Sequence, residues 1–235
     1  MDYCYIENSG FLMRQDHELV LIDCMKKLPE NIAAGFDSSY KLTVLASHFH
    51  SDHFSTSIFD LRHRQPDTQY ILSSDIMQRR KRNIPQDAHV NSVEKGQSVI
   101  ANGIHITAWG STDIGVSFHL DWGGKQIFHA GDLNYWHWKD ESTPEGIQRA
   151  EHAFERELEE IANGIPALDL AFFPVDPRMG SDYFRGAVRF AQVMRPKVFV
   201  PMHFGYRLNA PQAFYDEMDP LTQVIRTAEG WRTLP

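Results

Sequence analysis

Four of the six side chains in the run His48-Phe49-His50-Ser51-Asp52-His53 belong to types that bind metal ions. Residues two apart in extended backbone point the same way, so His48 and His50 can present two imidazoles to one cation. The chain then turns, and Asp52 with His53 can face a second cation beside the first. Imidazole and carboxylate groups suit zinc, manganese or iron. The alternative is a polar turn that faces solvent, and the density of ligand types makes it the weaker interpretation.

Two further ligand candidates lie far from this run in the sequence. Asp132 follows a predicted strand and Gly131, whose missing side chain lets other backbone come close. His203 follows an apolar run that also predicts a strand. Taken alone, the first could be a turn carboxylate and the second a capped or partly buried histidine. Because sites in layered α/β folds assemble just beyond strand ends, we expect both to join the histidine run.

The pattern of apolar residues predicts the strands and helices that must position these side chains. Residues 42–46 form a short apolar run, typical of an interior strand covered on both faces. Asn102-Gly103 and Trp122-Gly123-Gly124 each predict a hairpin turn, within 98–109 and 115–130. Pro144 begins a helix whose apolar residues recur every three or four positions until Gly164. Further strands are expected over 3–6, 10–14, 19–23, 70–73, 168–174, 197–201 and 223–227, and further helices over 55–64, 75–82, 182–194 and 212–218.

The composition and charge of the chain narrow the classes of function. With 235 residues, 42% of them apolar and 23% charged, the chain has the composition of a globular protein with a buried core. Its formal net charge of −8 argues against nucleic acid as a partner, because phosphate binding needs basic contacts. The basic cluster Arg79-Arg80-Lys81-Arg82 is interpreted as the solvated face of a helix. We therefore expect a small-molecule substrate, and a homo-oligomer is compatible with the sequence.

The sequence predicts neither a membrane span nor a secretion signal. No stretch approaches the roughly 18 apolar residues of a span. The segment Met1-Asp2-Tyr3-Cys4 has neither a basic region nor a long apolar run. Cys4 and Cys24 fit no zinc motif and are expected to be buried small hydrophobes. These features predict a cytoplasmic location, in a reducing environment.

The order His-x-His-x-Asp-His, then Gly-Asp after a hairpin, then a late histidine after a strand, resembles the metallo-β-lactamase superfamily. The resemblance is greatest to the bacterial branch related to ascorbate-phosphate lactonases and to N-acyl phosphatidylethanolamine phospholipase D. It spans nearly the whole chain and implies a single domain over 1–235. It also implies an α/β fold, a four-layer αββα sandwich of two similar halves, with the metals at one edge between the two sheets.

The resemblance implies ligands for two metal ions, namely His48 and His50 for the first, Asp52, His53 and His203 for the second, and Asp132 as a bridge between them. The family usually has another histidine for the first metal, shortly before the strand pair that leads to Gly-Asp. In this chain that stretch is Trp109-Gly110-Ser111-Thr112-Asp113, where Asp113 is the strong ligand type. Asp113 is therefore predicted either to complete the first site or to be a loop carboxylate that caps a turn.

Two more segments are candidates for contact with a substrate. The aromatic run 134–138 could wall a pocket, since pockets are mostly apolar with few polar anchors, and its alternative role is packing under a loop. The segment 174–178, past another strand end, could support the metal ligands or bind an anionic group, and its alternative role is a simple ion pair. The substrate-binding candidates are Tyr135, Trp136, His137, Asp176 and Arg178.

Such a site predicts a metal-dependent hydrolase that uses one or two Zn²⁺ ions, with Mn²⁺ or Fe²⁺ as alternatives. A bound cation lowers the pKa of water to about 7, and Asp52 is the candidate catalytic residue that takes up the proton. This chemistry suits small esters, lactones, amides and phosphodiesters alike. The alternatives are a nuclease of the same superfamily, which would need a basic groove, and a non-catalytic metal-binding protein. Oxygen- or nitric-oxide-reducing di-iron proteins of this fold have glutamate where this chain has His50.

Overall fold

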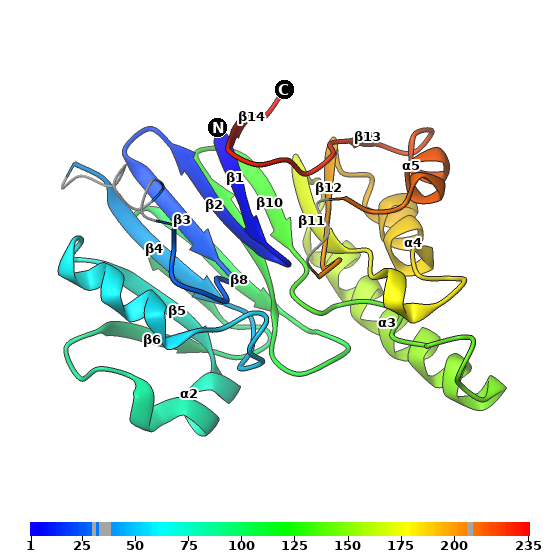
Figure 1. Cartoon of the computed structure of the whole chain (residues 1–235), viewed down its shortest axis with the longest axis horizontal. Coiled ribbons are helices and arrows are strands. Elements are labelled where there is room, and N and C mark those ends of the chain that lie inside the picture. The colour runs from blue at the N-terminus through cyan, green and yellow to red at the C-terminus, as the bar shows by residue number, and fades with distance from the viewer. Residues whose placement is uncertain (30–31, 33–38, 206–208) are drawn as a thin grey trace.

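Two β-sheets pack face to face, and helices cover their outer sides, in the computed structural model of the chain (Figure 1). The structure describes residues 1–29, 32, 39–205 and 209–235. Within these residues each sheet has seven strands. The fold is the four-layer αββα sandwich that the sequence predicts.

The first sheet has the strand order β14-β1-β2-β3-β4-β5-β6. Strands β1 to β3 pair in antiparallel fashion, whereas β3 to β6 run parallel and need crossover connections. The strands are β1 (Asp2–Glu7), β2 (Gly10–Gln15), β3 (Glu18–Ile22), β4 (Lys41–Ala46), β5 (Gln69–Ser73), β6 (His89–Val93) and β14 (Trp231–Thr233).

The second sheet repeats this arrangement in the order β13-β12-β11-β10-β9-β8-β7. Strands β7 to β10 are antiparallel, and β10 to β13 are parallel. All residues of β11 and β12 are buried, because this part of the sheet is covered on both faces. The strands are β7 (Ser98–Ala101), β8 (Ile104–Trp109), β9 (Ser117–Trp122), β10 (Lys125–His129), β11 (Leu170–Pro174), β12 (Val198–Met202) and β13 (Gln223–Val224).

Helices form the two outer layers. Those beside the first sheet are η1 (Thr56–His63), α2 (Ser74–Arg80) and η2 (Lys81–Asn83), and those beside the second are α3 (Pro144–Gly164), α4 (Arg185–Met194) and α5 (Gln212–Met218), with a short turn η3 (Pro177–Met179) after β11. Helix α3 buries Phe154, Leu158 and Ile161 on one face. The Thr143 side chain begins this helix by accepting a hydrogen bond from Gly146 N at 3.2 Å.

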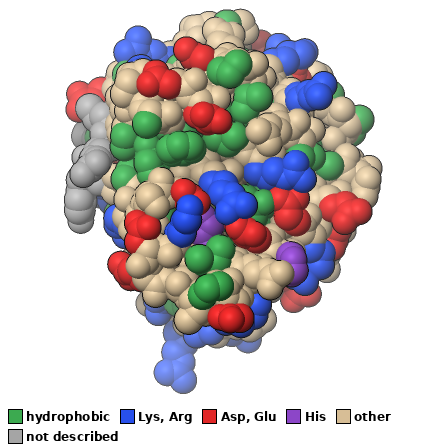
Figure 2. Space-filling view, turned by 90° about the vertical axis from the view of Figure 1, so that its right-hand side faces the viewer, with side chains coloured by type: hydrophobic (Ala, Val, Ile, Leu, Met, Phe, Trp, Pro, Cys, Tyr) green, Lys and Arg blue, Asp and Glu red, His purple; other side chains and the backbone are tan. Residues whose placement is uncertain are grey.

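The helix layer beside the second sheet has an outer surface of mixed charge. Figure 2 shows acidic and basic side chains interspersed on this face. Arg189 of α4 pairs with Glu155 of α3 at 2.8 Å, and Arg185 pairs with Glu151. These ion pairs join the two helices across their exposed sides.

Two apolar clusters form the core. One includes Phe11 and Phe172, which bring the two sheets into contact at a ring distance of 4.2 Å. The other lies between the first sheet and its helices and includes Phe59 of η1. In β4, Leu45 belongs to the first cluster and Val44 to the second, because successive strand residues point to opposite faces. Burial of both faces explains the continuous apolar run in this strand.

Most predicted elements agree with the structure, and the strands that were missed or predicted too long lie at sheet edges. The helix expected over 212–218 is α5, and the two predicted hairpins are β7–β8 and β9–β10. The edge strands β6 and β14 are largely exposed, and their polar sequences gave no strand signal. Residues 56–63 form a 3-10 helix, and β13 is shorter than predicted. None of the helices in the described part of the chain combines the length and apolar character that a membrane span requires.

The parallel strands bring their carboxyl ends to one edge of the sandwich. Asp23 directly follows β3, and His48 follows β4 shortly after its end. In the second sheet, Asp132, Asp176 and His203 come shortly after β10, β11 and β12. Because neighbouring parallel strands end at the same edge, these side chains gather there.

Candidate metal centre

The loop after β4 divides the histidine run into two pairs. His53 N and Phe54 N both donate to the His50 carbonyl, at 3.1 and 2.9 Å, and this closes a turn. His48 and His50 join one group of ligand atoms, while Asp52 and His53 join another. The pairing is the one that the spacing of the run predicts.

Two groups of side chains have ligand atoms close enough to hold a metal ion each. Group 1 is His48, His50, Asp113 and Asp132, and group 2 is Asp52, His53 and His203, with the ligand atoms of each group within 4.8 Å of one another. In group 1, His50 Nδ1 lies 3.4 Å from Asp113 Oδ2. In group 2, His203 Nε2 lies 3.4 Å from Asp52 Oδ2. Ligand atoms bound about 2.0–2.2 Å from a shared cation are roughly 3.0–3.5 Å apart, so both groups have a suitable spacing.

Asp132 lies between the two groups. Its Oδ2 is 3.5 Å from His48 Nε2, and its Oδ1 is 2.9 Å from His53 Nε2 and 3.3 Å from His203 Nε2. One oxygen therefore faces group 1 and the other faces group 2, as in a bridging carboxylate. Gly131 permits this approach at φ +53°, because a Cβ there would lie 2.9 Å from the side chain of Ser47.

Several buried ligand atoms have no hydrogen bond in the described part of the chain, and these atoms are His48 Nε2, His53 Nε2, His203 Nε2 and Asp132 Oδ1. His53 Nε2 and Asp132 Oδ1 are near neighbours, but they are not oriented as a hydrogen bond. Leaving a buried polar atom unpaired costs about 1–3 kcal/mol, so such atoms are rare in stable folds. One divalent cation at each group would together satisfy all four, and the donor set therefore fits two metal ions.

Carboxylates hold the other nitrogen of both buried imidazoles in group 2. Asp23 Oδ2 lies 2.7 Å from His53 Nδ1, and Asp176 Oδ2 lies 3.1 Å from His203 Nδ1. A carboxylate in this position fixes the tautomer and orientation of an imidazole, so that Nε2 points at the metal. In group 1 a hydroxyl does the same, since Ser47 Oγ is 2.9 Å from His48 Nδ1.

Asp23 is the supporting residue that the sequence analysis missed. It is fully buried, and it accepts hydrogen bonds from Ser47 N and Ser47 Oγ, both at 2.7 Å. It therefore connects the end of β3 to the start of the loop that carries the ligands. Its only signal in the sequence is its position at the end of a predicted strand, over 19–23.

The carboxylates stabilise positive charge at group 2. Burial alone would lower the pKa of His203, but the charge of Asp132 and the hydrogen bond with Asp176 raise it to about 9. Burial opposes protonation of His53 as well, yet Asp132 and Asp23 raise its pKa well above the usual value. The same field favours a bound cation, which would take the place of these protons.

Group 1 is more open than group 2. The side chains of His50 and Asp113 are 40% and 44% exposed, whereas that of His53 is fully buried. Apart from Asp113, no described side chain pairs with the ring nitrogens of His50. The structure brings Asp113 into group 1 together with His48, His50 and Asp132.

An open pocket of about 280 Å³ lies over both groups, lined by His50, Asp52, Thr112, Asp113, Asp132, Trp136, Trp138, Arg178 and His203. Trp136 Nε1 donates to the Asp132 carbonyl at 2.6 Å, and its ring lies 5.5 Å from that of His203. The Trp138 ring stacks against that of Trp136 at 6.4 Å. An aromatic wall beside a polar floor suits a small substrate with an apolar part.

Tyr135 and His137 do not line this pocket. Tyr135 is buried against Phe154 with a ring distance of 4.4 Å, and its hydroxyl donates to Glu155. The His137 ring is buried and stacks on that of Tyr135 at 6.2 Å. Alternate side chains of this segment therefore point to opposite sides, with the two tryptophans at the pocket and Tyr135 and His137 in the core.

Asp176 and Arg178 form an ion pair at the edge of the site. Arg178 Nε lies 2.9 and 3.0 Å from the two carboxylate oxygens of Asp176. Asp176 is fully buried and also contacts His203, whereas the Arg178 side chain is 65% exposed and lines the pocket. The buried Asp176 therefore contacts a ligand of group 2, and the exposed Arg178 is part of the pocket wall.

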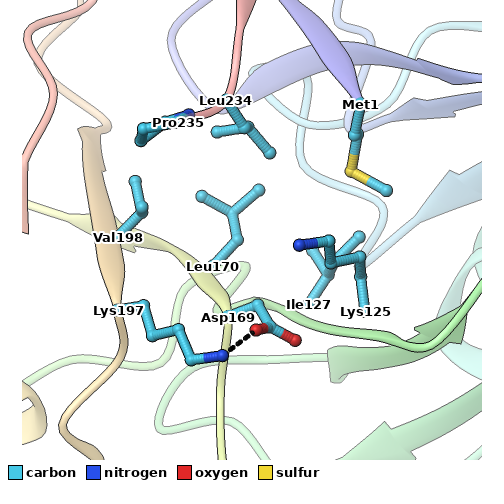
Figure 3. A pocket seen from close by; sticks show the side chains of 9 residues that line it. All are labelled: Met1, Lys125, Ile127, Asp169, Leu170, Lys197, Val198, Leu234 and Pro235. Atoms are coloured by element: carbon cyan, nitrogen blue, oxygen red, sulfur yellow. Dashed lines mark hydrogen bonds and ion pairs between the residues drawn. The ribbon is translucent and has the colours of Figure 1, made fainter.

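A smaller pocket of about 100 Å³ lies at the other end of the second sheet (Figure 3). Leu170 and Val198, which begin β11 and β12, line it together with the ion pair Lys197–Asp169 at 2.7 Å. Neither group 1 nor group 2 contributes a residue to it. The two groups of ligand atoms therefore lie at the carboxyl ends of the parallel strands and not at this opposite end.

Comparisons with known proteins agree with this architecture. A family model described as the beta-lactamase superfamily domain matches residues 19–204. No curated protein matches the chain. Among solved structures, Igni18, a metallo hydrolase from the archaeon Ignicoccus hospitalis, is 18% identical with a TM-score of 0.68, and the match covers 100% of this chain and 99% of that chain.

Two other solved structures with the same fold are named for different activities. CmlA, a diiron β-hydroxylase from Streptomyces venezuelae, is 13% identical with a TM-score of 0.69, over 99% of this chain and 54% of that chain. A diphosphatase from the PhnP family is 14% identical with a TM-score of 0.57, over 95% of this chain and 82% of that chain. At these identities the likeness concerns the fold.

Proposed function

Because the chain belongs to the beta-lactamase superfamily, whose domain model matches residues 19–204, we propose that it is a metal-dependent hydrolase of a small substrate. The observation that carries this proposal is the set of buried ligand atoms without a hydrogen-bond partner among the described residues, beside an open pocket. The whole chain, 1–235, would act as one domain. Zn²⁺ is the expected metal, because imidazole and carboxylate ligands suit it, and Mn²⁺ and Fe²⁺ are the alternatives.

In this proposal group 1 and group 2 each hold one cation, with Asp132 as the bridge. Divalent cations bound there would polarise a carbonyl or phosphoryl oxygen and acidify water. Asp52 is the proton acceptor and passes the proton to the leaving group. Its carboxylate is 41% exposed at the pocket, and the neighbouring His203 holds its pKa well below the ordinary value. It is therefore ionised at neutral pH, the state in which a carboxylate binds a cation.

In this proposal the aromatic side chains of the pocket wall bind the substrate and take no part in the reaction. Trp136 and Trp138 offer stacked aromatic surface to an apolar part of the substrate. The resemblance to lactonases and to a phospholipase D supports esters, lactones and phosphodiesters as the bonds to test first. The shared fold with a diphosphatase supports the inclusion of phosphate esters.

A nuclease function is the second candidate, and one observation favours it. The guanidinium of Arg79 lies over the ring of Phe49 at 4.6 Å, and that of Arg80 lies over it at 5.4 Å. Phe49 directly precedes His50 in the sequence, and both arginines are exposed on α2. A polyanion bound at group 1 could contact them, and short RNA and single-stranded DNA therefore belong in the substrate screen.

The test is hydrolysis by the purified full-length protein after measurement of its metal content. The zinc-loaded protein should cleave at least one of a set of p-nitrophenyl esters, lactones and p-nitrophenyl phosphodiesters. Asp52→Ala should lower kcat by about 100-fold or more on that substrate, because it removes a ligand and the proton acceptor together. Asp121→Ala, an exposed carboxylate on β9, is the matched control and should leave kcat unchanged. Full activity of Asp52→Ala would rule out the role given to Asp52.

A further inference from the structure

Arg178 is the only lysine or arginine that lines the pocket over the two groups in the described part of the chain. Its guanidinium is held by Asp176, because Nε lies within 3.0 Å of both carboxylate oxygens and Nη2 also donates to Oδ2. Asp176 is itself fixed, since it is fully buried and bonded to His203 Nδ1. The plane of the guanidinium therefore has a defined orientation relative to group 2.

The outer side of this guanidinium is open. The Arg178 side chain is 65% exposed, and its Nη1 has no hydrogen-bond or ion-pair partner among residues 1–29, 32, 39–205 and 209–235. An arginine has five N–H donors in a rigid fork, and Asp176 occupies only the side formed by Nε and Nη2. The donors on Nη1 remain available to a molecule in the pocket.

Arg178 also lies between two pockets. One is the 280 Å³ pocket over the metal-ligand groups, and the other has about 150 Å³ and is lined by Glu7, Asn8, Met25 and Gly205. Both pockets include Asp52 and Arg178 in their walls. A molecule whose scissile bond lies at the two groups can therefore extend past Asp52 and reach the guanidinium.

We propose that Arg178 forms an anion-binding subsite, and that the substrate carries an oxyanion, a carboxylate or a phosphate, beside the bond that is cleaved. A fixed guanidinium pairs with such a group through planar, charge-assisted hydrogen bonds. The carboxylates of Asp52 and Asp113 disfavour an anion elsewhere on the pocket wall. This inference rests on the proposed function, because it names the substrate class of the same site.

The competing explanation is that Arg178 only positions Asp176, and binding without turnover separates the two. Zinc-loaded protein is titrated calorimetrically with phenylphosphonate, phenylacetate and the neutral phenylacetamide, and its metal content is measured in parallel. R178Q should weaken binding of at least one anion by about ten-fold or more, with unchanged metal content and unchanged phenylacetamide binding. R178K keeps the charge but not the fork and should retain part of the affinity. The anion with the larger loss tells a phosphate from a carboxylate subsite.

The matched control is R185Q, which removes the same charge from an ion pair with Glu151 outside both pockets and should bind all three probes as the wild type does. Equal anion affinity in R178Q and the wild type would overturn the subsite. Loss of zinc in R178Q, with an equal loss for all three probes, would overturn it too and would assign Arg178 to holding Asp176. Because no hydrolysis is measured, this inference and the proposed function can fail separately.

Discussion

In group 2 a carboxylate supports each of the two buried imidazoles, whereas in group 1 half of the ligands are partly exposed and no carboxylate supports the imidazoles among the described residues. In group 2 both imidazoles are buried, with Asp23 behind His53 and Asp176 behind His203. In group 1 a hydroxyl lies behind the imidazole of His48, whereas the imidazole of His50 is 40% exposed and pairs only with Asp113 among the described carboxylates. Ligands that are already ordered lose less entropy on binding. We therefore expect group 2 to bind its ion more tightly and to fill first.

Of the substitutions that alter the difference in metal affinity between the two groups, Asp23→Asn should have the largest effect. This change keeps the shape of the side chain but removes the charge behind His53, 2.7 Å from its Nδ1. Loss of such a supporting carboxylate typically costs 10–100-fold in metal affinity, and about that loss is expected at group 2. Competition with a chromophoric zinc chelator measures it.

The control for Asp23→Asn is Asp121→Asn, an exposed carboxylate on β9. Zinc affinity should be unchanged in this control, and the thermal unfolding of both variants should be followed without metal. If Asp23→Asn binds zinc as tightly as the wild type, the carboxylate behind His53 does not account for the strength of group 2.

Asp23 is the part of this site that the sequence did not predict. The ligands of group 2 and the sandwich fold were predicted, because the histidine run, Gly131-Asp132 and His203 follow recognisable strands. The role of Asp23 depends on β3 pairing parallel to β4 across a long connection. Antiparallel pairing would carry Asp23 to the opposite edge, and the apolar pattern of the two strands is the same in both cases.

The aromatic run after Asp132 was also predicted correctly only in part. All of its large side chains were candidates for the pocket wall, but only Trp136 and Trp138 line it. Tyr135 packs on Phe154, and His137 stacks on Tyr135 in the core. Side chains two positions apart share a side here, as in extended backbone. Composition indicates an aromatic pocket, but the direction of each ring depends on backbone conformation that composition does not specify.

A smaller effect is expected at group 1, where Asp113→Ala should lower metal content from two ions toward one. Asp113 is 44% exposed, so water can replace its carboxylate, and we expect a loss on the order of ten-fold in affinity at group 1 alone. Asp113→His supplies the imidazole that related proteins usually have and should restore full occupancy. Metal analysis after dialysis distinguishes these proteins, with Asp121→Ala as the control. Equal, full occupancy in Asp113→Ala and the wild type would make Asp113 only a loop residue.

The smallest effect on zinc affinity is expected from a change at Asn8, which contacts the loops that carry ligands of group 2. Asn8 lies in the turn between β1 and β2 at φ +52°, and its carbonyl accepts from His203 N at 2.9 Å. Its side chain accepts from Gly205 N at 3.2 Å and lies 3.4 Å from Asp52 Oδ2, to which it donates. One residue of the first sheet therefore contacts two loops that carry ligands of group 2. Among the described residues, no contact from this turn reaches a ligand of group 1.

Asn8→Gly removes the side-chain hydrogen bonds and keeps the positive φ, which alanine would hold only at a cost of about 1 kcal/mol. The long hydrogen bonds of this side chain contribute roughly 1 kcal/mol together, so zinc affinity at group 2 should fall about five-fold. Asn102→Gly is a matched control, because Asn102 has φ +50° and donates to the Leu42 carbonyl and to Thr43 Oγ1, at the start of β4 and away from the ligands. Both variants should lower the Tm by a few degrees, but only Asn8→Gly should weaken zinc binding. An equal loss of zinc affinity in Asn102→Gly would mean that any loosening between the sheets weakens group 2, and the ordered surroundings of that group would then depend on the whole sandwich rather than on the turn at Asn8.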